Sequence, residues 1–205
     1  MGAPSSSKDY GKIEACLKLY TSNYSNSAYS DTNQTYLELY QYMLESVYEN
    51  EGFWIGRYEA GIEGENSRTL HTDIATSGNA VIKQNKIPYN YITRDEVQKL
   101  ASEMNYDGAT SSLIFGIQWD LALKYIETKK ATATNNLTTN STKIGNHKNN
   151  LWYITNKSAK YSKDAGSTYL PCPYEKKEEE GVLLTTGADE SFSLMNIYDI
   201  AGNIR

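Results

Sequence analysis

Apolar residues recur at the three-to-four-residue spacing of a helix in three separate segments of this chain. The segments cover residues 37–48, 94–104 and 113–127, and long polar stretches divide them. Because an amphipathic helix must bury its apolar stripe against another surface, this pattern constrains the fold more than any other feature. We expect an α+β fold in which two or three helices pack on a small, mostly antiparallel sheet with long loops.

The second of these helices carries its own start signal. Thr93 is a favourable N-cap residue, and Glu96 follows three positions later, which is the spacing of a capping box. Val97, Leu100 and Met104 then form the stripe to be buried. The spacing predicts a helix that begins directly after Thr93.

Strands are predicted where short aromatic or β-branched runs are bounded by glycine. Residues 53–60 are the best such run, and residues 182–186 and 80–83 are shorter ones. Residues 61–80 and 129–170 are rich in Gly, Asn, Ser and Thr and are expected to be loops. We interpret the mixed charge run at residues 175–180 as a solvated turn.

Charge and hydropathy exclude several classes of protein. The chain has 205 residues, enough for one ordinary domain or at most two small ones, and it carries 20 Lys and Arg against 25 Asp and Glu. The lysines are scattered and the net charge is -5, so we expect no nucleic-acid partner. No apolar run approaches the roughly 18 residues that a membrane span needs, and the first residues do not resemble a signal peptide.

The cysteines and histidines are too few and too far apart in the sequence to suggest a catalytic or metal site. Cys16 and Cys172 are the only cysteines and His71 and His147 the only histidines, all far apart in the sequence. A thiolate zinc site or a histidine-centred triad needs more such residues at short spacing. We favour two unpaired thiols, although a single disulfide between them stays open.

Four segments, in order, resemble the formylglycine-generating enzyme (sulfatase-modifying factor) family, whose domain is a variant of the C-type lectin fold. The first is Gly-Phe-Trp-Ile-Gly-Arg-Tyr-Glu, and the second is an Ile-Pro-Tyr-Asn-Tyr-Ile-Thr entry into a helix. The third holds Gln-Trp-Asp-Leu-Ala, and the fourth is Asn-Ile-Tyr-Asp-Ile-Ala-Gly-Asn-Ile. They occupy residues 52–59, 87–104, 112–122 and 196–204.

The resemblance implies a domain over residues 36–205 that is incomplete at its C-terminus, preceded by a tail and loop over residues 1–35. In the family, the turn of the fourth segment can hold a calcium ion. The matching positions here are Asp199 for a side-chain oxygen and Gly202 and Ile204 for carbonyl oxygens. The alternative is a tight turn without metal, in which Gly202 supplies the unusual backbone angles and Asp199 caps it.

The resemblance does not extend to the catalytic residues of the family. The family oxidises a substrate cysteine with a copper-assisted cysteine pair in its C-terminal third, and neither Cys16 nor Cys172 matches those positions. We therefore assign no catalytic residue and expect a non-catalytic module that binds a protein or glycan ligand or displays a surface. The alternatives are a truncated enzyme of this family and a pilin-like structural subunit.

The resemblance also indicates where such a module works. Lectin-like relatives include variable proteins that retroelements diversify in bacteria and phages, so we expect display on a bacterial cell or phage particle. The 18 tyrosines, with many Asn, Ser and Thr residues, have the composition that binding loops favour. Without the strands that follow in the family, we expect an open C-terminal edge through which the chain forms homo-oligomers or pairs with another strand.

Overall fold

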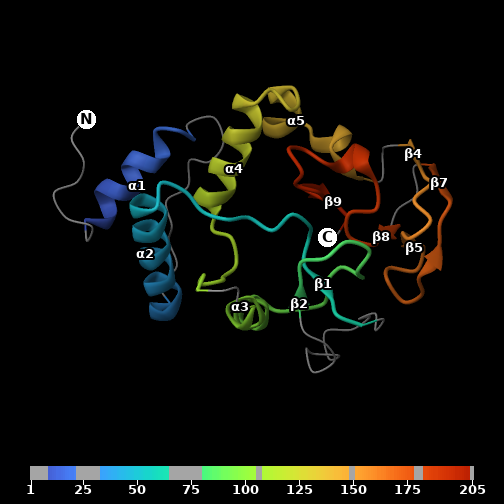
Figure 1. The fold of residues 1–205 in the computed structure, drawn as a ribbon, viewed down its shortest axis with the longest axis horizontal. Coiled ribbons are helices and arrows are strands. Elements are labelled where there is room, and N and C mark those ends of the chain that lie inside the picture. The colour runs from blue at the N-terminus through green and yellow to red at the C-terminus, as the bar shows by residue number, and fades with distance from the viewer. Residues whose placement is uncertain are drawn as a thin grey trace. The chain divides into compact units, whose positions relative to one another are not determined.

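The structure is a computed structural model that describes residues 9–21, 33–64, 80–104, 108–147, 151–177 and 182–203. The chain forms two compact units. One consists of Met1–Ile55 and Ile114–Lys130, and the other of Gly56–Leu113 and Ala131–Arg205. Helices and short strands occur together (Figure 1), which confirms the α+β class. The single domain expected over residues 36–205 stays a prediction.

The first unit is helical. It contains α1 (Tyr10–Lys18), α2 (Gln34–Glu49) and α4 (Gly116–Thr128). The side chain of Asn33 accepts from the first amides of α2, so this helix begins where its cap is supplied. The apolar stripes of the three helices pack into one core, whose buried members are Ile13, Leu17, Tyr40, Met43, Leu44, Val47, Phe115 and Ile117.

The three helices predicted from the sequence are confirmed in α2, α4 and α3 (Arg94–Glu103), of which α3 lies in the second unit. The capping box of α3 is formed as expected. Thr93 Oγ1 accepts from the amide of Glu96 at 3.4 Å, and the carboxylate of Glu96 accepts from the amide of Thr93 at 2.8 Å. Local sequence chemistry therefore sets the start of this helix.

The strands that the structure describes in the second unit are short and form four small sheets. Three sheets are antiparallel: β1 with β2, β4 with β7, and β6, β5 and β8 in that order. β3 and β9 pair in parallel. The bounds are β1 Gly61–Ile62, β2 Ala80–Val81, β3 Gly145–Asn146, β4 Leu151–Ile154, β5 Lys160–Ser162, β6 Leu170–Pro171, β7 Tyr174–Lys177, β8 Leu183–Leu184 and β9 Ala201–Gly202.

Two clusters of apolar side chains hold this unit together. One joins β4, β5 and β8 to the C-terminal residues, and the other lies under β1 and the chain that leads to α3. The first consists of Ile154, Ala159, Cys172, Val182, Leu184, Ala188 and Phe192. The second consists of Ile62, Ile87 and Tyr89, with Tyr169 packed at its edge.

The strand predicted over residues 53–60 is wrong. Residues 52–56 have no regular structure, and the strand begins only at Gly61. Within the described residues, the backbone contacts of this run are isolated: the amide of Tyr198 donates to the carbonyl of Arg57 at 2.8 Å and the amide of Tyr89 to that of Ala60 at 2.9 Å, and no ladder joins them. The short strands predicted near residues 80–83 and 182–186 are confirmed as β2 and β8.

The long loop predicted over residues 129–170 is also wrong. This stretch contains α5 (Thr134–Thr138), a 3-10 turn at Ser141–Lys143 and the strands β3, β4 and β5. Its polar residues form turns that connect very short elements, so no element is long enough to show a period. The charge run predicted as a turn begins in β7, and residues 178–180 lie outside the described residues. Residues 65–79 of the other predicted loop also lie outside them.

Candidate functional site

Asn203 is the centre of the hydrogen-bond network at the C-terminal turn. Its amide nitrogen donates to Glu59 Oε2 at 3.0 Å and to the carbonyl of Leu184 at 3.1 Å. Its amide oxygen accepts from the backbone of Leu184 at 2.9 Å and from Asn146 Nδ2 at 3.0 Å. One side chain thus ties the turn to β8, to β3 and to the segment before β1.

Two half-buried carboxyl groups, of Glu59 and Asp199, lie at this turn. Asp199 Oδ2 accepts from the amide of Gly187 at 2.7 Å, and the amide of Glu59 also donates to this carboxylate. Burial raises the pKa of Glu59 to about 8, against the lowering effect of the Asn203 hydrogen bond, and the charge of Asp199 raises it further. Burial likewise raises the pKa of Asp199. Both groups therefore resist ionisation more than exposed carboxyls do.

The backbone of the turn is left-handed at three places. The φ angles are 56° at Asp199, 75° at Gly202 and 70° at Asn203. Glycine adopts this region without strain, and Asp and Asn tolerate it better than other residues do. The angle at Gly202 fits the alternative from the sequence, a tight turn, whereas the Asp199 carboxylate accepts from the amides of Gly187 and Glu59, which lie outside that turn.

The calcium ligands predicted at this turn are only partly within the described residues. Asp199 and Gly202 lie in one turn, whereas Ile204 lies outside the described residues. Calcium takes six to eight oxygen ligands, and the carboxylate of Asp199 already accepts amide hydrogens. Over the described ranges, no three His, Cys, Asp or Glu side chains gather closely enough to hold a metal ion. Calcium at Asp199, Gly202 and Ile204 stays a prediction.

The parallel pair of β3 and β9 requires glycine on both strands. A Cβ atom at Gly145 would overlap the carbonyl group of Ala201, and one at Gly202 would overlap the carbonyl group of Asn146. The backbones approach this closely only because neither residue has a side chain. The pair brings Asn146 within reach of Asn203.

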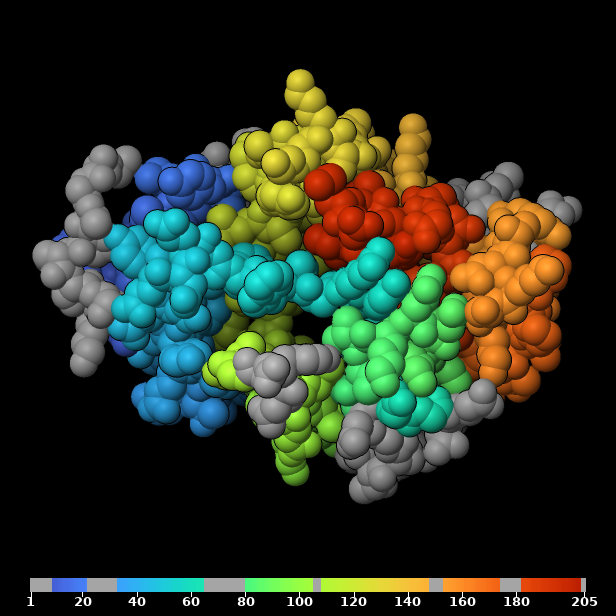
Figure 2. Space-filling view, in the orientation of Figure 1, coloured from blue at the N-terminus to red at the C-terminus, as the bar shows by residue number. Residues whose placement is uncertain are grey.

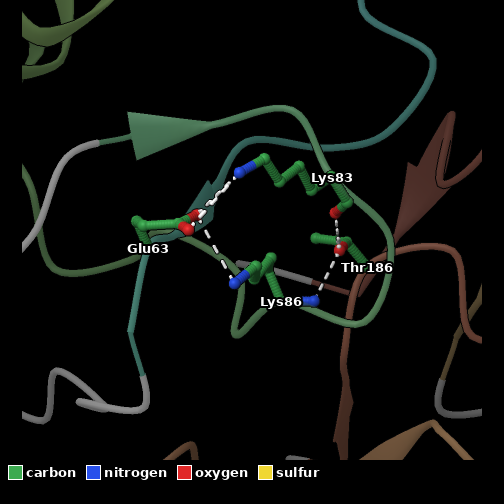
Figure 3. A network of polar contacts seen from close by, with 4 residues as sticks. All are labelled: Glu63, Lys83, Lys86 and Thr186. Carbon is green, nitrogen blue, oxygen red and sulfur yellow. Dashed lines mark hydrogen bonds and ion pairs between the residues drawn. The ribbon is translucent and has the colours of Figure 1, made fainter.

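A second network links Glu63, Lys83, Lys86 and Thr186 (Figure 3). Glu63 forms ion pairs with the ammonium groups of Lys83 at 3.3 Å and Lys86 at 3.4 Å. Thr186 Oγ1 donates to the carbonyl of Lys83 at 2.6 Å and accepts from the amide of Lys86 at 3.0 Å. Thr186 is fully buried, whereas Glu63 is largely exposed, so the hydroxyl is the stabilising part of this network.

The residues between these networks connect them. The amide of Asn85 donates to the carbonyl of Thr186 at 2.8 Å, and Gln84 Nε2 donates to the carbonyl of Gly187 at 2.8 Å. The C-terminal residues, red in Figure 2, lie beside the orange residues 151–177, in agreement with a 3.0 Å hydrogen bond from Thr185 to the carbonyl of Lys160. Hydrogen bonds from residues 84–85 and to Lys160 thus fix the position of residues 184–187.

A cluster around the exposed side chain of Arg57 lies next to the C-terminal turn, with Tyr58 half-buried and Tyr198 buried. The guanidinium carbon of Arg57 lies 5.7 Å from the ring centroid of Tyr58 and 5.8 Å from that of Tyr198, and the two rings are 5.0 Å apart. Arg57 also donates to Asn196 Oδ1 at 3.3 Å. We call Arg57, Tyr58, Met195, Asn196 and Tyr198 the Arg57 cluster.

Met195 and Asn196 form the tip of a two-residue hairpin in this cluster. Leu194 and Ile197 exchange backbone hydrogen bonds at 2.8 and 3.0 Å, and φ is 54° at Met195 and 63° at Asn196. Two positive φ angles are typical of a type I′ turn, in which Asn is favoured and Met is not. Met195 is nevertheless 41% exposed at the tip.

The sequence pointed to some of these residues and missed others. The four segments of the resemblance included Glu59 and Asn203, but no local pattern showed that they would meet. The two cysteines are both free, with Cys16 in the helical unit and Cys172 in the other, and burial raises the pKa of the Cys172 thiol to about 11.

Comparison of the chain with protein-family models, curated proteins and solved structures gives no match. The resemblance therefore stays a prediction.

Proposed function

We propose that this chain is a non-catalytic ligand-binding or display module of the C-type lectin-like superfamily, exposed on a bacterial or phage surface. One observation carries the proposal. The first and fourth segments of the resemblance meet, because Tyr198 donates to the carbonyl of Arg57 at 2.8 Å and Asn203 donates to Glu59 at 3.0 Å. Retroelement-diversified variable proteins are one group of this kind.

The division between scaffold and surface supports this function. The groups that close the fold, Glu59, Asn203 and Thr186, are internal to the hydrogen-bond networks, while Arg57, Met195 and Asn196 are exposed. An exposed arginine that is held over two tyrosine rings, beside an exposed hairpin tip, suits recognition, because it is already positioned and loses little conformational entropy on binding. The Arg57 cluster is the ligand-contacting surface in this proposal.

The state of the cysteines favours binding over oxidation. A thiol attacks as its thiolate, and a pKa raised to about 11 leaves very little thiolate on Cys172 at neutral pH. Cys16 belongs to the helical unit. The enzyme alternative nevertheless has a direct test, in which a cysteine-containing peptide is incubated with the protein and copper and the aldehyde product is sought by mass spectrometry. Formation of the aldehyde would replace the proposal.

The binding function is tested by display. A library randomised at Arg57, Met195 and Asn196 is expressed on yeast and sorted for protease resistance, then selected on immobilised bacterial glycans and on lysozyme as a model protein. We expect most of this library to stay folded and to yield binders. A matched library randomised at Glu59, Asn146 and Asn203 should lose protease resistance. Equal loss of folding in both libraries would contradict a display surface at the Arg57 cluster.

A further inference from the structure

Both ends of the Arg57 side chain are held by the hairpin whose tip is Met195 and Asn196. At the backbone end, the carbonyl of Arg57 accepts from the amide of Tyr198 at 2.8 Å. At the other end, Arg57 Nη2 donates to Asn196 Oδ1 at 3.3 Å. An exposed side chain that is held in this way has lost part of its rotational freedom before a ligand arrives, which favours binding.

The two tyrosine rings that contact the guanidinium are held by the fold in turn. A Cβ atom at Gly187 would stand 2.6 Å from two ring carbons of Tyr58, so this ring lies directly against the backbone of the glycine. Tyr198 is 4% exposed, and its hydroxyl donates to the carboxylate of Glu190, a contact that raises the pKa of Tyr198. The guanidinium therefore lies over rings that have fixed positions.

Within the described ranges, no carboxylate neutralises this guanidinium. Its contacts there are the two tyrosine rings and the amide oxygen of Asn196, all of which are uncharged. The guanidinium of arginine has five N–H donors in a planar fork that matches a carboxylate. The positive charge of Arg57 and most of its donors are therefore left for an anionic ligand.

Met195 provides an apolar contact next to this charge. It precedes Asn196 in the chain and is 41% exposed. Its φ of 54° lies in the left-handed region, where a hairpin tip favours glycine or asparagine, so a methionine is held there against the preference of the backbone. An exposed residue in a strained conformation indicates a role in contacts outside the fold.

The single cation and its apolar neighbour define the chemistry of the partner. Nucleic acids and anionic membranes are bound by several cations together, whereas the Arg57 cluster contains one. A single guanidinium fork fits one carboxylate, and Arg and Met are enriched where proteins bind proteins.

We propose that Arg57 and Met195 bind a segment of another protein in which a glutamate stands next to an aliphatic residue. The glutamate carboxylate accepts from the guanidinium of Arg57, and the aliphatic side chain packs on Met195. This inference rests on the binding function proposed above and names the class of its ligand, an acidic peptide.

A peptide array tests this ligand class with the labelled full chain as the probe. The first array carries Gly-X-Glu-Leu-X-Gly peptides with every residue type at X, printed densely so that weak contacts are retained. A second array has Gln in place of Glu, and a third has Ser in place of Leu. We expect binding to the first array to exceed binding to the second by about tenfold or more, and to exceed binding to the third.

Four variants assign the contact to residues. Arg57→Gln should lower binding to the first array about tenfold, and Arg57→Lys should not restore it, because lysine has the charge but not the fork. Met195→Gly should lower binding to the level of the third array. Lys157→Gln removes an exposed positive charge of the same unit, so it is the matched control and should bind as the unchanged protein does. Near-ultraviolet circular dichroism verifies that each variant is folded.

Three results would overturn the proposal. Equal binding to the Glu and Gln arrays, or binding to neither, would exclude an acidic peptide as the ligand. Binding that Arg57→Gln leaves unchanged would place the contact elsewhere. A dimer in light scattering that Arg57→Gln dissociates would make a second copy of this chain the partner.

The library randomised at Arg57, Met195 and Asn196 separates failure of this inference from failure of the proposed function. Binders from that library, combined with no preference of the unchanged chain for the Glu array, would show that only the ligand class is wrong. A library that yields no binders would contradict the binding surface itself.

Discussion

The amide nitrogen of Asn203 donates to the carboxyl of Glu59 at 3.0 Å, although the two residues are 144 positions apart in the sequence. Two further hydrogen bonds lie beside it, from the amide of Gly187 to the Asp199 carboxylate and from Asn203 Nδ2 to the carbonyl of Leu184. A carboxyl buried in this way makes the stability of the fold depend on its protonation.

Glu59→Gln tests that dependence. The pKa of Glu59 rises from 4.5 to about 8 on folding, so between these values the folded state holds a proton that the unfolded state has released. The free energy of unfolding should therefore fall as pH rises from about 4.5 to 8, by up to about 4–5 kcal/mol. The Gln variant keeps an acceptor for Asn203 and should lose this slope. Urea unfolding at pH 5, 6, 7 and 8 measures it.

Glu63→Gln is the control for that series, because Glu63 is exposed and paired with lysines. It should keep the pH slope of the unchanged protein. A Glu59→Gln variant whose unfolding curves keep the same slope would show that other groups set the pH dependence.

Gly202→Ala should destabilise the protein by about 3 kcal/mol or more, since the new methyl group overlaps the carbonyl group of Asn146 and the backbone is left-handed. Gly64→Ala separates the two causes. Gly64 has φ of 116° and no described atom within 4 Å of its Cβ position, so it carries only the backbone strain, about 1–3 kcal/mol. Thermal unfolding of the two variants measures the difference, and equal losses would argue against close approach of β3 and β9.

Thr186→Val should cost about 1–3 kcal/mol, because it removes a buried hydroxyl that bonds the carbonyl of Lys83 and the amide of Lys86 and leaves both without that partner. Lys83→Gln removes an exposed ion pair in the same network and should change stability by less than about 1 kcal/mol. Denaturant midpoints of the two variants are compared. A larger loss in Lys83→Gln would reverse the ranking of these contacts.

Met195→Gly should stabilise the protein by about 0.5–1 kcal/mol, because Met is held at a φ of 54° that glycine adopts freely. The measurement is the melting temperature. Met195→Ala serves as the control, since it removes the long side chain but keeps the strained backbone. If Ala stabilises as much as Gly, exposure of the Met side chain is the cause and not the backbone angle.

Local chemistry explains which elements the sequence predicted. The helix after Thr93 carries its own cap and stripe, and α2 and α4 have the period of their buried faces, so each could be found from neighbouring residues. The aromatic run at residues 53–60 has the composition of a strand, but its described backbone contacts with Tyr198 and Tyr89 are isolated and build no ladder. The strands of residues 145–177 are two to four residues long, too short for a period to show.

The candidate site was predictable only in part. Asp199 and Gly202 were found because the turn has a recognisable order of residues, and their left-handed angles fit it. Glu59, Asn146 and Asn203 come from three distant segments, and their meeting depends on how the strands of the second unit pair. No spacing along the chain encodes such a meeting.

The separation of Glu59 and Asn203 also bears on how the chain is made. At a synthesis rate of about 5–20 residues per second, roughly 7–29 seconds pass between the two residues leaving the catalytic centre of the ribosome. During that time α1 and α2 are already available, whereas the C-terminal unit still lacks the turn that closes it. Its half-built strands are exposed to other chains in this interval, so a chaperone bound near residues 57–62 would protect the nascent protein when it is most vulnerable.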